Sequence, residues 1–120
     1  MMLWKRSLKL TPNKILSLLG MAQKAGKISG GAFQVEQSVK SKKARLVIIS
    51  EDMSERSAKQ YNDMCSYHKV PLVKYGDMES LGHAIGKEYR AAVAVNDAGF
   101  AESLLKLINA SDNGGSRING

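Results

Sequence analysis

Apolar side chains return every three or four residues in five segments of the chain, which is the period of a helix with one buried face. We expect helices over about 12–24, from Ala32 onward, and over 54–68, 77–84 and 96–108. Thr11 and Pro12 are typical of an N-cap and a first helical position, and Gly26 should end the first helix. In the second helix, Ala32, Val35 and Val39 share one side and should face the core.

Short apolar runs rich in β-branched residues separate these helices. Leu46–Ser50 has the composition of a buried central strand, and further strands are expected at 70–75 and 91–95. Residues 27–29 form a short extended link. Because helices alternate with strands, the pattern predicts an α/β fold, a three-layer α/β/α sandwich around a small mixed sheet of about four strands.

The length of 120 residues fits one domain. We expect a basic N-terminal extension over 1–10, the domain over 11–110, and a polar, glycine-rich flexible tail over 111–120. Without a membrane-length apolar run or a signal-peptide pattern, the sequence indicates a cytoplasmic protein, and a single cysteine, Cys65, agrees with a reducing compartment.

Positive charge is concentrated in the first part of the chain. Residues 1–45 hold ten Lys or Arg and one acid, whereas residues 46–120 hold eight and ten. This asymmetry favours a polyanionic partner, nucleic acid before membrane, although a solubilising surface explains charge equally well. Residues 24–45 alone carry a net charge of +5.

Gly30 and Gly31 stand at the centre of this basic stretch, before the second helix. Glycines let a backbone approach a ligand closely, and the free N–H groups of a helix start attract phosphate. Phe33, Gln37 and Lys40 share the other side of that helix. A face that only contacts water does not call for the aromatic ring of Phe33. A second candidate is the loop from Gly86 to Arg90, and we expect both segments to meet at one end of the sandwich.

Other chemistries have weaker support. Gly82–Glu88 resembles a P-loop, but its glycine spacing is one residue short, Glu88 replaces the magnesium-binding hydroxyl, and a helix precedes it. Cys65 and His68 are half of a zinc pattern without a second half, so they are expected to be core or boundary residues. Glu51 and Asp52 can hold a metal but more often turn the chain. We therefore expect no catalytic residue, cofactor or metal.

Three stretches together resemble a known family: ISGGAFQVEQSVKSKKARLVIISEDMSE, VPLVKYGDMESLGHAIGKEYRAAVAV and NDAGFAESLL. They are similar to the ribosomal protein family L-seven-Ae and L-thirty-e, most closely its small bacterial YlxQ-like branch, over about 13–108. The resemblance implies an α/β/α sandwich that binds RNA without catalysis, in many members at kink-turns. It also implies an RNA surface at the start of the second helix, with another in the loop before the last strand.

The family pattern in the second helix is a glycine, an Asn-Glu pair two and three residues later, and a lysine three further on. Gly31 matches the glycine, whereas Phe33, Gln34 and Gln37 depart from the other positions. Glu51 and Asp52 match an acidic turn beside the loop. The residues expected to contact RNA are Lys27, Gly30, Gly31, Phe33, Gln34, Gln37, Lys40, Glu51, Asp52, Gly86, Lys87, Glu88, Tyr89 and Arg90.

The leading hypothesis is a monomeric, cytoplasmic protein that recognises structured RNA, either kink-turn-like or ribosomal, in association with the ribosome or translation factors. A protein-interaction module that offers the same basic face to an acidic partner is the alternative. A nucleotide-acting enzyme using His83 and Lys87 is a weaker one.

Overall fold

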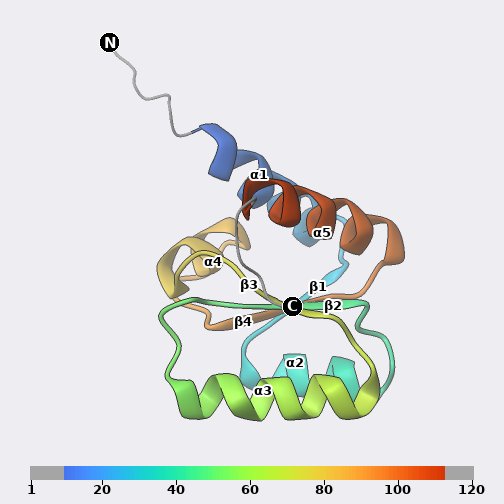
Figure 1. Ribbon diagram of the computed structural model, residues 1–120. Helices are drawn as coiled ribbons and strands as arrows, with labels where there is room; N and C mark the ends of the chain where they lie inside the picture. The colour runs from blue at the N-terminus through green and yellow to red at the C-terminus, as the bar shows by residue number, and fades with distance from the viewer. Residues whose placement is uncertain (1–9, 113–120) are drawn as a thin grey trace.

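The computed structural model describes residues 10–112. In order, its elements are α1 (Leu10–Lys24), β1 (Ile28–Gly30), α2 (Ala32–Lys40), β2 (Leu46–Ile49), α3 (Glu55–His68), β3 (Leu72–Lys74), α4 (Met78–Ala84), β4 (Ala92–Val95) and α5 (Ala98–Asp112) (Figure 1). The predicted extension and tail lie outside the described residues, apart from Leu10, Ser111 and Asp112, which are helical.

The strands form one mixed sheet in the order β1-β4-β2-β3. β4 lies antiparallel between β1 and β2, and β3 runs parallel to β2 at the edge. Helices α1, α4 and α5 cover one face of the sheet, and α2 and α3 cover the other (Figure 1). The three-layer α/β/α sandwich with four strands is therefore confirmed.

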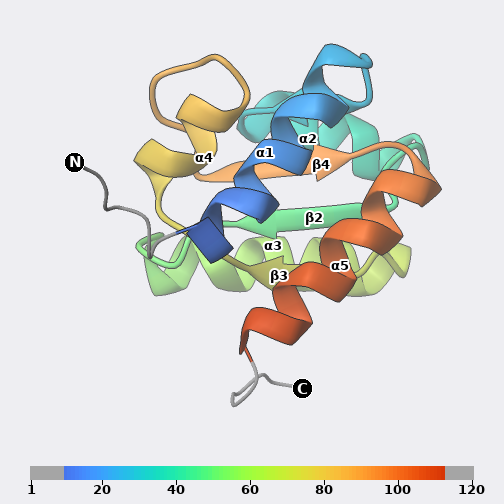
Figure 2. The same ribbon diagram turned by 90° about the horizontal axis from the view of Figure 1, so that it is seen from above.

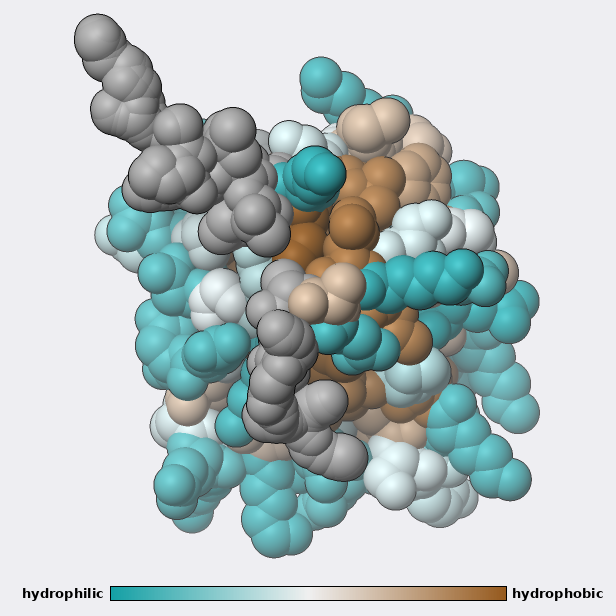
Figure 3. Space-filling model, turned by 45° about the horizontal axis from the view of Figure 1, so that its top comes forward, coloured by the Kyte–Doolittle hydropathy of each residue, from teal (hydrophilic) through white to brown (hydrophobic). Residues whose placement is uncertain are grey.

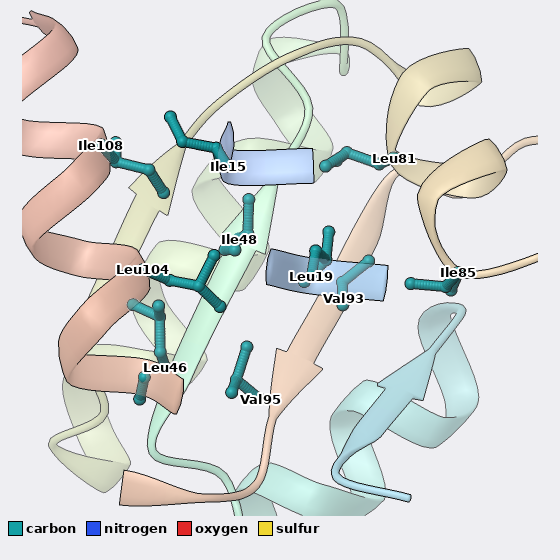
Figure 4. Close-up of a cluster of buried hydrophobic side chains, with 11 residues drawn as sticks. Ile15, Leu19, Leu46, Ile48, Leu81, Ile85, Val93, Val95, Leu104 and Ile108 are labelled. Carbon is teal, nitrogen blue, oxygen red and sulfur yellow. The ribbon is translucent and has the colours of Figure 1, made fainter. Parts of the chain in front are cut away.

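Each face of the sheet has its own apolar core. Along β2, Leu46 and Ile48 point to one face while Val47 and Ile49 point to the other, which is why the strand is an unbroken apolar run. The larger cluster, beneath α1, α4 and α5, consists of Ile15, Leu19, Leu46, Ile48, Leu81, Ile85, Val93, Val95, Ala101, Leu104 and Ile108 (Figure 4).

The face that carries α1 and α5 keeps apolar side chains near its surface. Figure 3 shows them gathered between hydrophilic residues. Beside the start of β2, Leu46, Ala101 and Leu105 line an open groove of about 290 Å³, together with Arg45, Ala98 and Glu102. Within residues 10–112, no helix combines the length and the apolar character that crossing a bilayer requires.

Two predicted boundaries on the N-terminal side were wrong. α1 begins at Leu10, so Thr11 is not its N-cap; Pro12 is tolerated there because N–H groups in the first turn have no intrahelical acceptor. The predicted link over 27–29 contributes instead to an edge strand, in which Ile28 pairs with Val95 and Gly30 with Val93. Gly30 therefore belongs to β1, and Gly31 alone caps α2.

The buried face of α2 also differs from the prediction at one position. Val35 and Val39 are fully buried, as expected, but Ala32 is exposed because it is the first helical residue, where α2 leaves the end of β1. Ser38 completes the buried face, and its hydroxyl lies 2.7 Å from the hydroxyl of Ser29 in β1.

The remaining helix starts were predicted correctly. Ser54 and Asp77 cap α3 and α4 through their side chains, and Asp97 accepts a hydrogen bond from the Phe100 amide at the start of α5. β3 is shorter than the predicted 70–75 and begins after Pro71. Proline has no N–H to donate to a neighbouring strand, and only the Pro71 carbonyl is paired, with the Val47 amide.

Replacing Val39 with Asp should abolish cooperative folding. The carboxylate would be buried without a partner at a fully enclosed position, which costs several kcal/mol out of a typical total stability of about 5–15 kcal/mol. Ala32→Asp places the same charge on the exposed first turn of the same helix and should leave the melting temperature nearly unchanged. Thermal denaturation followed by circular dichroism compares the two, and equal melting temperatures would contradict the assigned helix face.

Candidate nucleic-acid interface

Several chain connections meet at one end of the sheet, which we call the site end. It comprises Gly31 and the connections over 50–54, 75–77 and 85–91. Backbone hydrogen bonds hold them together: the Gly31 amide donates to the Ala92 carbonyl at 3.1 Å, and the Ser50 amide donates to the Ala91 carbonyl at 2.9 Å. Figure 2 shows this end on the left, where the loop between α4 and β4 projects. The helix start at Gly31 and the loop over 86–90 therefore lie at the same end of the sheet.

Gly31 gives α2 an open N-terminus. Its φ of 102° and ψ of 155° lie in a region that is almost exclusive to glycine. No side chain caps the helix, so its first amides face outward. The side-chain oxygen of Gln34 folds back to 3.4 Å from where a Cβ on Gly31 would lie. The helix start is therefore a small anion-accepting surface with an amide group beside it.

Arg90 joins the loop to this helix start. Its Nε lies 3.7 Å from the position of a Cβ on Gly31, and its Nη1 donates to the Tyr89 carbonyl at 2.7 Å. Among the described residues, no carboxylate oxygen lies within 4.0 Å of the guanidinium. A half-buried arginine that is held in place without a counter-ion can give its remaining donors to an incoming phosphate or base edge.

Gly82 in α4 holds the loop against the helix. A Cβ there would lie 2.5 Å from the Glu88 carbonyl oxygen and 2.9 Å from the Cα of Tyr89. The Gly82 carbonyl also accepts from the Lys87 amide at 2.8 Å. Only a glycine permits this contact, so loop and helix pack backbone to backbone.

Asp77 fixes where α4 begins. It forms a capping box with Ser80, whose amide donates to the Asp77 carboxylate at 2.8 Å. Hydrogen bonds from the Ser80 backbone, and then from its side chain, hold the pKa of Asp77 below its usual value. This contribution to stability is complete above the unfolded pKa and is lost as pH falls through the lowered folded pKa.

The predicted acidic turn, Glu51 and Asp52, helps to hold the loops of the site end together. Asp52 accepts a hydrogen bond from the Met78 amide at 3.1 Å, and the Glu51 amide donates to the Gly76 carbonyl at 2.7 Å. These bonds tie the end of β2 to the start of α4. Both side chains are exposed beside the loop, so they add negative charge to the site end.

Two aromatic rings are exposed at the site end. Phe33 on the first turn of α2 is 66% exposed, and Tyr89 in the loop is 62% exposed. Large apolar rings are normally covered, and a pair on segments joined by Arg90 offers stacking platforms for bases. Gln37 is exposed one turn beyond Phe33, as predicted.

Two predicted site residues lie elsewhere. Lys27 precedes β1 and Lys40 ends α2, so both lie toward the opposite end of the sheet, and Lys40 forms an ion pair with Glu36 at 2.7 Å. The expectation that the basic stretch 24–45 surrounds the helix start was wrong, because β1 and α2 carry its charges away from Gly31. Only pairing in the sheet reveals this.

The structure does not support the phosphate-loop or zinc-site interpretations of the sequence. Gly82, His83 and Ala84 are helical, so the P-loop-like segment forms no phosphate-wrapping loop. Cys65 is buried, and burial raises its pKa to about 11, which keeps the thiol protonated; His68 stacks edge-on with Tyr67. Among residues 10–112, no group of three or more His, Cys, Asp or Glu is arranged to hold a metal.

A sequence model of the ribosomal protein L7Ae/L30e/S12e/Gadd45 family matches residues 13–105. The chain belongs to this family. The RNA-binding protein YlxQ of Bacillus subtilis is 42% identical over 92 residues, which are 77% of this chain and 92% of that one. The large ribosomal subunit protein eL8 of Thermoplasma volcanium is 33% identical over 96 residues, 79% of each chain. A solved structure from Bacillus halodurans, of a protein of unknown function, has a TM-score of 0.77 and 38% identity, covering 80% of this chain and 97% of that one.

In this member of the L7Ae/L30e family, Gly82→Ala should displace the loop. The added methyl group would meet backbone atoms that cannot move aside cheaply, so stability should fall by about 1–3 kcal/mol. His83→Ala, at an exposed neighbouring position of α4, is the control and should change stability little. Thermal denaturation and amide chemical shifts of residues 88–90 report both effects; unperturbed shifts in Gly82→Ala would show that this contact does not position the loop.

Proposed function

We propose that this protein is a non-catalytic RNA-binding protein whose site end recognises structured RNA. The observation that carries the proposal is the position of the Arg90 side chain against Gly31, which makes one surface of two segments far apart in the chain. Family membership supports it, and so does the name of the Bacillus subtilis relative, an RNA-binding protein.

The groups of the site end suit different parts of an RNA. The outward amides of α2 and the guanidinium of Arg90 suit phosphates or a guanine edge. Gln34 and Gln37 both donate and accept, as base edges require. The rings of Phe33 and Tyr89 suit unpaired bases, for which stacking contributes about 1–3 kcal/mol per base. The contact residues at this end are Gly30, Gly31, Phe33, Gln34, Gln37, Gly86, Lys87, Glu88, Tyr89 and Arg90, with Glu51 and Asp52 beside them.

The RNA need not be a standard kink-turn. Gln34 replaces a carboxylate and Gln37 a lysine of the family pattern, and neutral hydrogen bonds are roughly half as strong as charge-assisted ones. Losing or weakening two base contacts, each about 1–3 kcal/mol, would lower affinity for a standard kink-turn a hundredfold or more. Ribosomal RNA is an equal candidate, since a relative is a large-subunit ribosomal protein. We extend the proposal to a monomer in the cytoplasm, acting with the ribosome or translation factors.

Arg90→Ala should lower affinity for RNA recovered by crosslinking in cells by about tenfold to a hundredfold, the effect of about 1–3 kcal/mol per base contact. Arg90→Lys keeps the charge but loses the planar fork, so it should restore only part of the loss. Lys106→Ala removes an exposed cation on α5 and serves as the control. Fluorescence anisotropy titrations at one fixed salt concentration measure all four proteins. Wild-type affinity in Arg90→Ala would remove the site end from the proposal.

Replacing Phe33 with Asn, Gln34 with Glu and Gln37 with Lys should increase affinity for a standard kink-turn at least tenfold, or about 1.4 kcal/mol. All three side chains are exposed, so the helix should be unaffected while charge-assisted contacts to the G·A pairs replace neutral ones. The same kink-turn with Watson-Crick pairs in place of the G·A pairs is the control RNA. Equal affinity of the native and triple-substituted proteins would mean that these residues do not touch the RNA.

A further inference from the structure

The chain connections divide its charge between the two ends of the sheet. At the site end, the connections 50–54, 75–77 and 85–91 carry two cations and four acids. At the opposite end, the connections 25–27, 41–45, 69–71 and 96–97 carry five cations and one acid, Asp97, and Lys24 precedes them at the end of α1. We call this second surface the basic end; its cations are Lys24, Lys27, Lys42, Lys43, Arg45 and Lys69.

The sheet holds the basic end rigidly. The Arg45 amide donates to the Val95 carbonyl at 2.7 Å, and the Asn96 amide donates to the Lys27 carbonyl at 2.8 Å. Arg45 and Lys27 therefore flank the end of β4, on strands about 10 Å apart. The Asn96 side chain also donates to the Ser29 hydroxyl at 3.0 Å, which tightens the same junction. Figure 2 shows this end on the right, where α1 ends and α5 begins.

The six cations are exposed and uncompensated. Among the described residues, none of them has a carboxylate oxygen within 4.0 Å, whereas Lys40, Lys59 and Lys106 do. Mutual repulsion between neighbouring cations destabilises a fold unless a polyanion neutralises them. The concentration of charge thus requires an explanation beyond solubility.

Two of these lysines occupy backbone positions that favour glycine. Lys42 and Lys69 have φ of 66° and 60°, and within residues 10–112 they are the two non-glycine residues with positive φ. Each follows a helix in a Schellman arrangement: the Lys43 amide donates to the Ser38 carbonyl after α2, and the Val70 amide donates to the Cys65 carbonyl after α3. A lysine there is less stable than a glycine would be, so the cation is kept at the expense of stability.

Helix ends explain only part of this charge. Cations stabilise helix C-termini, and Lys24, Lys42 and Lys69 have that position. Lys27 and Arg45 directly precede strands and gain nothing from a helix dipole. Stabilisation of helix C-termini therefore does not account for all of the cations at the basic end.

We propose that the basic end is a second RNA-contacting surface, which takes the phosphate backbone of a helix that flanks the RNA held at the site end. This rests on the proposed function for the identity of the polyanion. α2 connects the two ends: it begins at Gly31, ends before Lys42 and Lys43, and spans about 14 Å with Gln37 exposed between. The site end specifies the RNA, and the basic end supplies most of the salt-dependent affinity.

The test compares two proteins that each lack three lysines. The first carries Lys27→Ala, Lys42→Gly and Lys43→Ala; glycine relieves the positive φ of Lys42, so the melting temperature should not fall. The second, with equal net charge, carries Lys14→Ala, Lys59→Ala and Lys106→Ala, all exposed positions outside the basic end. The probes are a kink-turn RNA with about 16 base pairs of flanking helix, the span of a small double-stranded-RNA-binding domain, and the same kink-turn without the flank.

Wild-type protein should bind the long probe with a salt slope that the first variant flattens by about 2 to 3 and the second leaves unchanged, since each lost phosphate contact removes about 0.7–0.9. The flank should strengthen wild-type binding and leave that of the first variant unchanged. Equal slopes for wild type and the first variant, or equal losses in both variants, would overturn the second surface. Loss of binding in Arg90→Ala with no effect of the first variant would leave the site end in place and reject only the basic end. The reverse pattern would reject the site end alone.

Discussion

The position of β4 between two antiparallel neighbours is the constraint on which the rest of the structure depends. At its start, the carbonyls of Ala91 and Ala92 accept hydrogen bonds from the amides of Ser50 and Gly31. At its end, the Val95 carbonyl accepts from the Arg45 amide, and the amide of the next residue, Asn96, donates to the Lys27 carbonyl. One buried strand of four residues, Ala92–Val95, thereby aligns both end surfaces. Buried amides that left this pairing would lose their partners, at about 1–3 kcal/mol each, so the alignment is held by the cost of breaking it.

Close backbone contacts at glycines complete the site end. Gly30 lies where a Cβ would come within 2.5 Å of the Ile85 side chain, and Gly82 lies directly against the loop backbone. The first contact lets the Ile85 side chain pack directly on β1, and the second packs α4 on the loop backbone. Because the Gly82 contact involves backbone atoms on both sides, it positions the loop that carries Arg90 more precisely than flexible side-chain packing would.

The proposal assigns specificity and charge to separate surfaces, and the two kinds of contact differ physically. Phosphate contacts are sequence-independent and screened by salt, whereas base contacts depend on exact placement. Acids at the site end would repel a backbone that approached without the correct contacts, which would favour discrimination over affinity. On the proposed arrangement, an RNA would be held through the basic end and selected at the site end.

The sequence by itself determined the alternation of helices and strands, the caps at Ser54 and Asp77, and the family, because local periodicity and hydrogen bonding within a few residues carry that information. It also singled out the helix start at Gly31 and the loop over 86–90 as candidate surfaces, but the contact of Arg90 with Gly31 came from the structure. It did not identify β1 as a strand, since three residues at a sheet edge have too little pattern, and it misplaced the cations around Gly31. Which end of the sheet each lysine occupies depends on strand direction, and strand direction depends on pairing between distant segments. Only the tertiary structure decided that the basic stretch and the anion-accepting helix start lie at opposite ends of the molecule.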